Sequence, residues 1–114
     1  MDVQAHITRL CKQIAETFDS QKVILFGSHA YGIPTLDSDI DLLVVMPFDG
    51  RIHEQAMKVR RGLDSSLPLD LLVRTPEQVQ ERIEMEDFFM REIFEHGKVL
   101  YEADDTGVDQ NRGG

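Results

Sequence analysis

The sequence predicts an α/β fold in which one small mixed sheet packs against helices. Apolar residues recur at helical spacing in several segments, short β-branched runs lie between these segments, and glycines or prolines separate the two kinds. Helical and extended segments alternate along the 114 residues, an order typical of layered α/β domains. We therefore expect one domain over residues 1–103, followed at 104–114 by a polar, glycine-rich tail that is disordered.

The first half of the chain is expected to contain two helices and two strands. Apolar residues at steps of three and four mark the first helix. The first strand is a short β-branched run that Gly27 closes, and Pro47 stops the second strand. The expected elements are a helix over about residues 2–19, a buried strand at 22–26, a short helix at 28–31 and a strand at 40–46.

The second half continues the same alternation. Thr75-Pro76-Glu77-Gln78 combines an N-cap, a proline at the first helical position and a capping-box partner, so a helix starts there. The other expected elements are a helix at 51–63, a strand at 69–74, a helix at 87–96 and an extended segment at 98–102. Apolar residues cover more than one stripe of the last helix. Most of them are expected in the core, with one side available to a partner: Phe88, Phe89, Met90, Ile93 and Phe94.

Charge and composition exclude several classes of protein. The chain has 21 acidic residues against 12 Lys and Arg, and its net charge of −9 repels a polyanion, so we expect no long nucleic acid as a partner. No apolar run approaches membrane-spanning length, and one cysteine, Cys11, cannot form an internal disulfide. These features predict a cytoplasmic protein without membrane contact. The densest basic cluster is expected on a solvated helix face: Lys58, Arg60 and Arg61.

Aspartates interrupt the apolar pattern in two of the expected strands. Asp39 and Asp41 are two residues apart, so their side chains point the same way, with Cα atoms roughly 7 Å apart. Asp70 interrupts the third strand and would join them if the two strands are neighbours. Converging carboxylates raise each other's pKa unless a cation neutralises them. Without a nearby His or Cys ligand, these oxygens suit Mg²⁺ or Mn²⁺ better than zinc.

The turn after the first strand supplies a complementary feature. Gly27 and Ser28 open a short helix, where free backbone N–H groups and a hydroxyl form a cradle for an anion. Phosphates held there would be bridged by metal ions to the aspartates. Pairs of such ions stabilise in-line displacement at phosphorus. The residues alone therefore indicate a site for a phosphorylated ligand and divalent metal.

The combined pattern resembles the nucleotidyltransferase superfamily of the DNA polymerase β type, and most closely its minimal members. It consists of the Gly-Ser pair, ten further residues, the Asp-Ile-Asp triplet and one aspartate on a later strand. The resemblance implies a polymerase β-like fold and metal-dependent transfer of a nucleoside monophosphate, such as AMP from ATP, to a hydroxyl. It also implies roles for five residues: metal binding by Asp39 and Asp41, a ligand or general base in Asp70, and nucleotide binding by Gly27 and Ser28.

The resemblance also suggests a partner. Minimal members often act as the antitoxin beside a helical HEPN-type toxin, and some adenylylate a tyrosine of that toxin, so it implies an acceptor hydroxyl on a partner protein. Association of this chain with copies of itself is a further open alternative. This chain departs from many minimal members, because His29 and Tyr31 stand where those have loop arginines. The remaining histidines show no ligand spacing and are expected at the surface or in helix caps: His6, His53 and His96.

Other interpretations compete with the enzyme. A non-catalytic antitoxin or interaction module could hold nucleotide or act by contact alone, which the altered loop favours and the three aspartates disfavour. A metal-dependent hydrolase on an unrelated α/β fold would leave Ser28 and the spacing unexplained. Asp39 and Asp41 could also belong to a solvated junction between loop and strand, and His29 could be an exposed loop residue rather than a phosphate contact.

Overall fold

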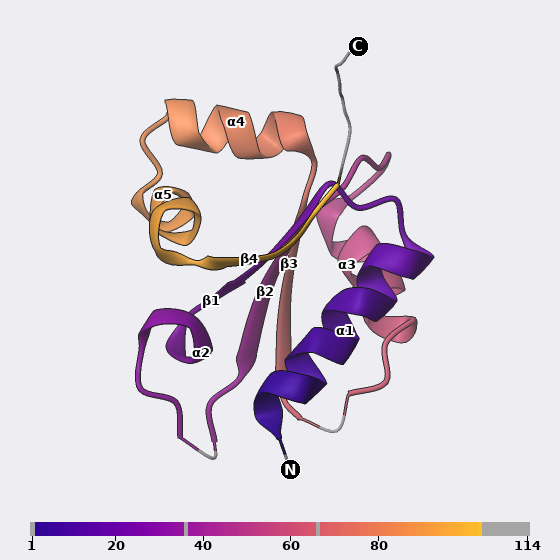
Figure 1. Ribbon diagram of the computed structural model, residues 1–114. Helices are drawn as coiled ribbons and strands as arrows, with labels where there is room; N and C mark the ends of the chain where they lie inside the picture. The colour runs from indigo at the N-terminus through magenta and orange to yellow at the C-terminus, as the bar shows by residue number, and fades with distance from the viewer. Residues whose placement is uncertain (1, 36, 66, 104–114) are drawn as a thin grey trace.

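The structure is a computed structural model that describes residues 2–35, 37–65 and 67–103. The tail expected at 104–114 lies outside the described residues. Figure 1 shows a four-stranded sheet flanked by helices. The elements are α1 (Val3–Thr17), β1 (Lys22–Phe26), α2 (Ser28–Tyr31), β2 (Ile40–Val45), α3 (Ile52–Arg61), β3 (Leu69–Arg74), α4 (Pro76–Glu84), α5 (Phe88–His96) and β4 (Lys98–Glu102). None of the described helices is both long and apolar enough to cross a membrane.

The sheet is mixed, with strand order β3-β2-β1-β4. β1 is antiparallel to both β2 and β4, whereas β2 and β3 are parallel. A parallel pair needs a crossover, and α3 supplies it. Because β2 and β3 are parallel, both begin at the same edge of the sheet, and β1 ends at that edge. The expected α/β fold with a small mixed sheet is thus confirmed.

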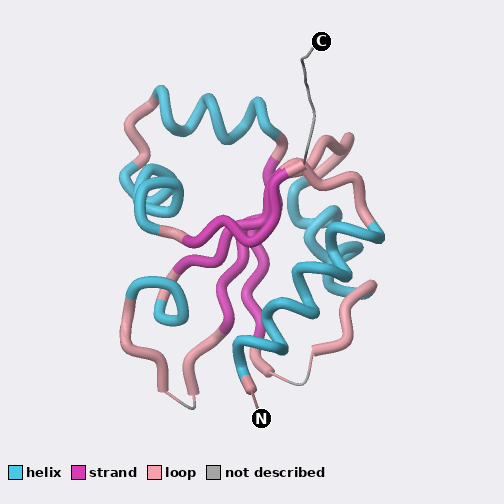
Figure 2. The backbone as a smooth tube through the Cα atoms, viewed as in Figure 1, coloured by secondary structure: helices cyan, strands magenta, loops and turns pink. Residues whose placement is uncertain are grey.

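Helices cover both faces of the sheet, so the central strand β2 is buried on both sides. Its residues Ile40, Leu42 and Val44 pack with side chains of α1 and α3, whereas Leu43 and Val45 pack with α4 and α5. Figure 2 shows the helices on either side of the strands. This double cover explains why β2 is a continuous apolar run after Asp41.

Local signals fix where the later helices begin. Thr75 Oγ1 accepts a hydrogen bond from the Gln78 amide at 3.1 Å, and Gln78 Oε1 accepts one from the Thr75 amide at 2.9 Å, so the expected capping box is confirmed. α5 begins at Phe88, one residue later than expected, because Asp87 is its N-cap and accepts hydrogen bonds from two amides of the first turn.

The expectation that most apolar residues of α5 lie in the core, with one side exposed, is confirmed. Met90 and Ile93 are buried, and Phe94 is half-buried. Phe88 is 79% exposed and Phe89 is 50% exposed. The reason is geometric, because α5 belongs to an outer layer and can turn only one stripe toward the sheet.

One expectation about polar residues is confirmed and another needs correction. The basic cluster Lys58, Arg60 and Arg61 is exposed as expected, and Arg60 Nη2 also donates to the Leu69 carbonyl at 2.6 Å, which joins α3 to β3. His6 is not at the surface, since its side chain is 2% exposed. It lies four residues before the buried Leu10, one helical turn along the same face of α1.

Candidate active site

The three aspartates lie at the edge where β2 and β3 begin. In the parallel register Asp41 is paired with Asp70, while Asp39 lies just before β2. Neighbouring strands are about 4.8 Å apart, so the backbones of Asp41 and Asp70 are adjacent. Asp41 is half-buried, and Asp39 and Asp70 are exposed. The fold therefore brings Asp70 to the same edge of the sheet as Asp39 and Asp41, which are distant from it in sequence.

Gly27 brings the turn after β1 against Asp41. Phe26, the last residue of β1, is paired with Asp41, so the chain turns directly beside this aspartate. Gly27 has φ 74° and ψ −154°, a combination that is essentially restricted to glycine. A Cβ at this position would collide with a carboxylate oxygen of Asp41. Glycine is thus required both by the backbone conformation and by the close approach of the Asp41 side chain.

Ser28 is the first residue of α2, next to this contact. The Gly27 carbonyl accepts hydrogen bonds from the amides of Ala30 and Tyr31 at 3.0 and 3.1 Å, which closes the single helical turn. The first amides of a helix have no acceptor within the helix. The turn at Gly27 therefore sets the start of α2 next to the Asp41 carboxylate, and Ser28 contributes a hydroxyl to this turn.

The electrostatics of this edge centre on Asp41. Burial raises the pKa of Asp41 above its usual range, and the neighbouring carboxylates of Asp70 and then Asp39 raise it further, while His29 lowers it. Within the described ranges the salt bridge is Lys22–Glu102, which involves none of these aspartates. The negative charge at the aspartate edge is therefore only weakly compensated by the protein itself.

His29 contributes more than the sequence indicated. The His29 side chain is half-buried, and its Nε2 lies 3.4 Å from the carbonyl oxygen of Ser38. Ser38 is the residue immediately before Asp39. Since a carbonyl only accepts, Nε2 is the donor in this contact. The interpretation of His29 as an exposed loop residue is wrong. The sequence signal for a role of His29 at the site was its position directly after the Gly-Ser pair.

The donor chemistry of this edge fits a divalent cation. Three carboxylates offer only oxygen ligands, which hard cations such as Mg²⁺ and Mn²⁺ prefer. The raised pKa of Asp41 arises first from burial and then from repulsion by Asp70 and Asp39, and a cation bound between the carboxylates would relieve this repulsion. Across residues 2–35, 37–65 and 67–103, no group of three or more His, Cys, Asp or Glu side chains is already arranged as a set of metal ligands. The strands therefore bring the backbones of the three aspartates together, while their carboxylates are not yet arranged as a set of metal ligands in the described residues.

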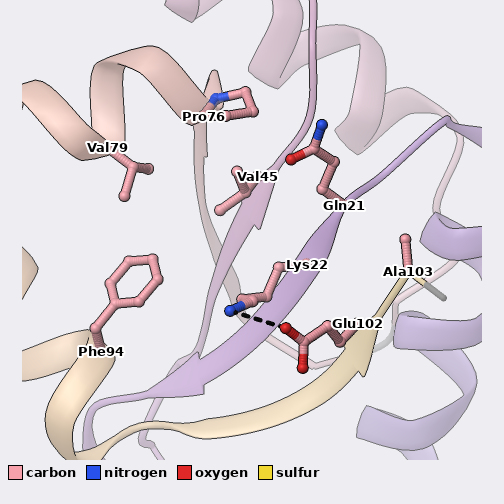
Figure 3. Close-up of a pocket in the computed structure, with 8 residues that line it drawn as sticks. All are labelled: Gln21, Lys22, Val45, Pro76, Val79, Phe94, Glu102 and Ala103. Carbon is pink, nitrogen blue, oxygen red and sulfur yellow. Dashed lines mark ion pairs between the residues drawn. The ribbon is translucent and has the colours of Figure 1, made fainter. Parts of the chain in front are cut away.

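A pocket at the opposite end of the sheet is distinct from the aspartate edge (Figure 3). Lys22 pairs with Val45 there, four residues along each strand from the Phe26–Asp41 pair, or roughly 13 Å away. Its lysine is already engaged, because Nζ lies 3.2 Å from Glu102 and 5.6 Å from the centre of the Phe94 ring. We therefore do not place a phosphate site in this pocket, which is lined by Gln21, Lys22, Val45, Pro76, Val79, Phe94, Glu102 and Ala103.

Comparison with known proteins defines the class to which this fold belongs. Residues 7–101 match the family of nucleotidyltransferase domains, and the chain belongs to that family. A protein of Methanocaldococcus jannaschii named "Putative protein adenylyltransferase" is 35% identical over 83 residues, which span 71% of this chain and 78% of that protein.

A solved structure agrees with this assignment at the level of the fold. The crystal structure of a "putative nucleotidyltransferase" from Sulfolobus solfataricus matches with a TM-score of 0.61 and 19% identity, over 86% of this chain and 78% of that one. The expected nucleotidyltransferase fold is confirmed.

Proposed function

We propose that this nucleotidyltransferase domain, residues 1–103, transfers AMP from ATP to a hydroxyl group of a partner protein and depends on Mg²⁺ or Mn²⁺. The observation that carries the proposal is the register that sets Asp70 beside Asp41, next to the Gly27 turn. Family membership supports nucleotidyl transfer. The name of the M. jannaschii relative supports AMP as the transferred group and a protein as the acceptor.

The nucleotide would bind at the turn that follows β1. The opening amides of α2 and the Ser28 hydroxyl suit phosphate oxygens, and Gly27 has no side chain to keep the triphosphate from the aspartates. His29 is held near the same turn by its contact with the Ser38 carbonyl, which already uses the Nε2 proton.

The aspartates would hold the metal and the acceptor. Asp39 and Asp41, joined by Asp70, would bind Mg²⁺ or Mn²⁺, which when bound neutralises charge on the phosphates and on the attacking oxygen. The acceptor hydroxyl attacks the α-phosphorus, the bond from that phosphorus to the bridging oxygen breaks, and pyrophosphate leaves. We assign the hydroxyl proton to Asp70, which is exposed at the edge where an acceptor can approach.

A protein acceptor agrees with the charge of the chain. A net charge of −9 disfavours a nucleic acid and favours a partner that offers basic residues near its acceptor side chain. We propose a helical HEPN-type toxin as this partner, with the chain as its cytoplasmic antitoxin. Self-association of the chain is compatible with this assignment.

The test is a transfer assay with α-labelled ATP, Mg²⁺ and the protein encoded by the neighbouring gene, which the proposal expects to be the helical toxin. Wild type should label a hydroxyl side chain of that protein, and Asp41→Asn should not. Asp49→Asn is the matched control, because Asp49 is an exposed aspartate beyond the far end of β2. Labelling by both variants would remove Asp41 from the site, and strong labelling of RNA would refute the protein acceptor.

Asp70→Asn separates binding from chemistry. Because the amide keeps the shape and removes the charge, the variant should bind Mg²⁺ and ATP within about tenfold of wild type, a difference of about 1.4 kcal/mol. It should lose transfer by at least about a hundredfold. Full transfer by this variant would end the proposed catalytic role of Asp70.

A second candidate is a nucleotide-binding antitoxin that acts by contact without turnover. It is favoured by His29 and Tyr31, which stand where many minimal members have arginines and so leave less positive charge for a triphosphate. This alternative is preferred if wild type binds Mg²⁺ and ATP and blocks its partner, yet transfers no label to it.

A further inference from the structure

A partly buried hydrogen-bond cluster links α1 to the loop that leads into β3. Both ring nitrogens of His6 have partners: Nδ1 lies 2.8 Å from Arg9 Nη2, and Nε2 lies 3.0 Å from Ser65 Oγ. Ser65 belongs to the connection between α3 and β3, shortly before Asp70. His6, near the N-terminus of the chain, therefore contacts the segment that delivers the third aspartate to the sheet edge.

The direction of these hydrogen bonds follows from the chemistry of Arg9. A guanidinium can only donate, so Nδ1 of His6 must accept, and the neutral ring carries its proton on Nε2. That proton is donated to Ser65 Oγ. The Ser65 hydroxyl in turn donates to the Leu67 carbonyl at 2.8 Å and accepts from the Leu67 amide at 3.3 Å. The Ser65 hydroxyl thus uses its one proton and both lone pairs. Every donor and acceptor of this hydroxyl has a partner when the hydrogen bonds run in these directions.

The residues that follow are also held, up to Asp70 itself. The Pro68 carbonyl accepts from the Ile40 amide at 2.9 Å, and the Leu69 carbonyl accepts from Arg60 Nη2 at 2.6 Å. The next residue in the register is Asp70, paired with Asp41. The entry to β3 is therefore fixed from three sides, by α1, α3 and β2, and His6 is the contact from α1.

We propose that His6 is a positioning residue for Asp70. Through Ser65 and the Leu67 carbonyl it holds the start of β3, and so the place of Asp70 opposite Asp41. The catalytic meaning of this role rests on the proposed function. A displacement of about 1 Å in a reacting group can lower a rate by about a hundredfold, so a loop contact away from the chemistry can matter. The Gly27–Ser28 turn lies at the end of β1 and does not take part in these bonds.

The test compares three variants of the full chain in the transfer assay. His6→Leu fills the buried position with an apolar side chain and removes both hydrogen bonds, so it should lower kcat by about tenfold and leave KM for ATP within about twofold. His6→Gln offers an amide oxygen to Arg9 and an amide N–H to Ser65, and should recover most of the loss. Ile14→Val, a buried change on the same helix, should reduce stability and leave kcat unchanged below its unfolding range.

Amide hydrogen exchange tests the positioning without any activity. The Ile40 amide donates to Pro68 at the aspartate edge, and the Met46 amide donates to the Arg74 carbonyl at 3.0 Å at the other end of the same strand pair. His6→Leu should speed exchange at Ile40 by about tenfold relative to Met46, because only the near end loses a support. Ile14→Val should change both amides alike.

The two measurements separate the two proposals. Equal acceleration at Ile40 and Met46 in His6→Leu, or none at either, would show that His6 serves only packing and would overturn the positioning role, whatever the transfer assay gives. Loss of kcat in His6→Gln equal to that in His6→Leu would overturn it as well. Absence of transfer by wild type would refute the proposed function alone, since the exchange result stands independently.

Discussion

Replacement of Gly27 by alanine tests the close approach on which the site depends. Two penalties combine at this position. The backbone lies at φ 74° and ψ −154°, which costs a non-glycine residue about 1–3 kcal/mol. The new Cβ also meets the Asp41 carboxylate, and overpacking of this kind costs about 1–3 kcal/mol. Gly27→Ala should therefore lower the free energy of unfolding by about 2–6 kcal/mol, out of a total of roughly 5–15 kcal/mol for a domain.

Gly50 provides a matched control for the backbone penalty. It also has a positive φ, 92°, but a Cβ there would meet no atom within 4 Å. Gly50→Ala should thus show the conformational cost alone, about 1–3 kcal/mol. In an Asp41→Ala background the obstacle at residue 27 is reduced to a Cβ at 3.4 Å, an ordinary contact, so Gly27→Ala should cost about as much there as Gly50→Ala does in wild type.

Urea unfolding of the four proteins and wild type, followed by circular dichroism, gives the required free energies. The coupling between Gly27→Ala and Asp41→Ala should be about 1–3 kcal/mol, within the range observed for residues in contact. The argument is refuted if Gly27→Ala costs the same in both backgrounds, or no more than Gly50→Ala, because the carboxylate would then not lie against the turn.

Three further predictions concern the same molecule. Because its pKa is raised in the folded protein, Asp41 binds more protons folded than unfolded, so stability should fall as pH rises from about 3.9, the usual aspartate pKa, through the folded value. Asp41→Asn should abolish this fall in urea titrations, and an unchanged pH slope would contradict the raised pKa. Mg²⁺ and ATP at about 100 times Kd should add about 2.7 kcal/mol of stability, measured by thermal shift. Asp39→Ala should lose most of this gain and Asp49→Ala should keep it, whereas an equal gain in both would exclude Asp39. Thr75→Ala removes the capping hydroxyl of α4 and should cost about 1 kcal/mol in urea unfolding, so a neutral result would argue against the cap.

Features that depend on neighbouring residues could be predicted from the sequence. The β-branched run at 22–26 and the apolar run at 69–74 predicted strands with these bounds, and Thr75 with Gln78 predicted the start of α4. The alternation of Asp39 and Asp41 could be read in the same way, because the period of a strand is local. The arrival of Asp70 beside Asp41 was conditional on strand pairing, which the sequence left open.

Features that depend on packing between distant segments could not be predicted. The collision that excludes a side chain at Gly27 arises from the antiparallel register of β1 and β2. The exposure of Phe88 depends on which stripe of α5 faces the sheet, and a helix apolar on several sides does not reveal this. His6 is intermediate, since its helical step to Leu10 indicated a buried face, whereas its partner Ser65 is far away in sequence.

The arrangement of the strand ends provides a way to handle the protein. The segment after β2 leaves the sheet at the edge opposite the aspartates, and within it Asp49 is exposed and Gly50 faces open space (Figure 1). A fluorophore or an immobilising tether attached at residue 49 would therefore leave the face that receives nucleotide and acceptor free in solution. Surface-based measurements of both ligands could then be made on one and the same orientation of the molecule.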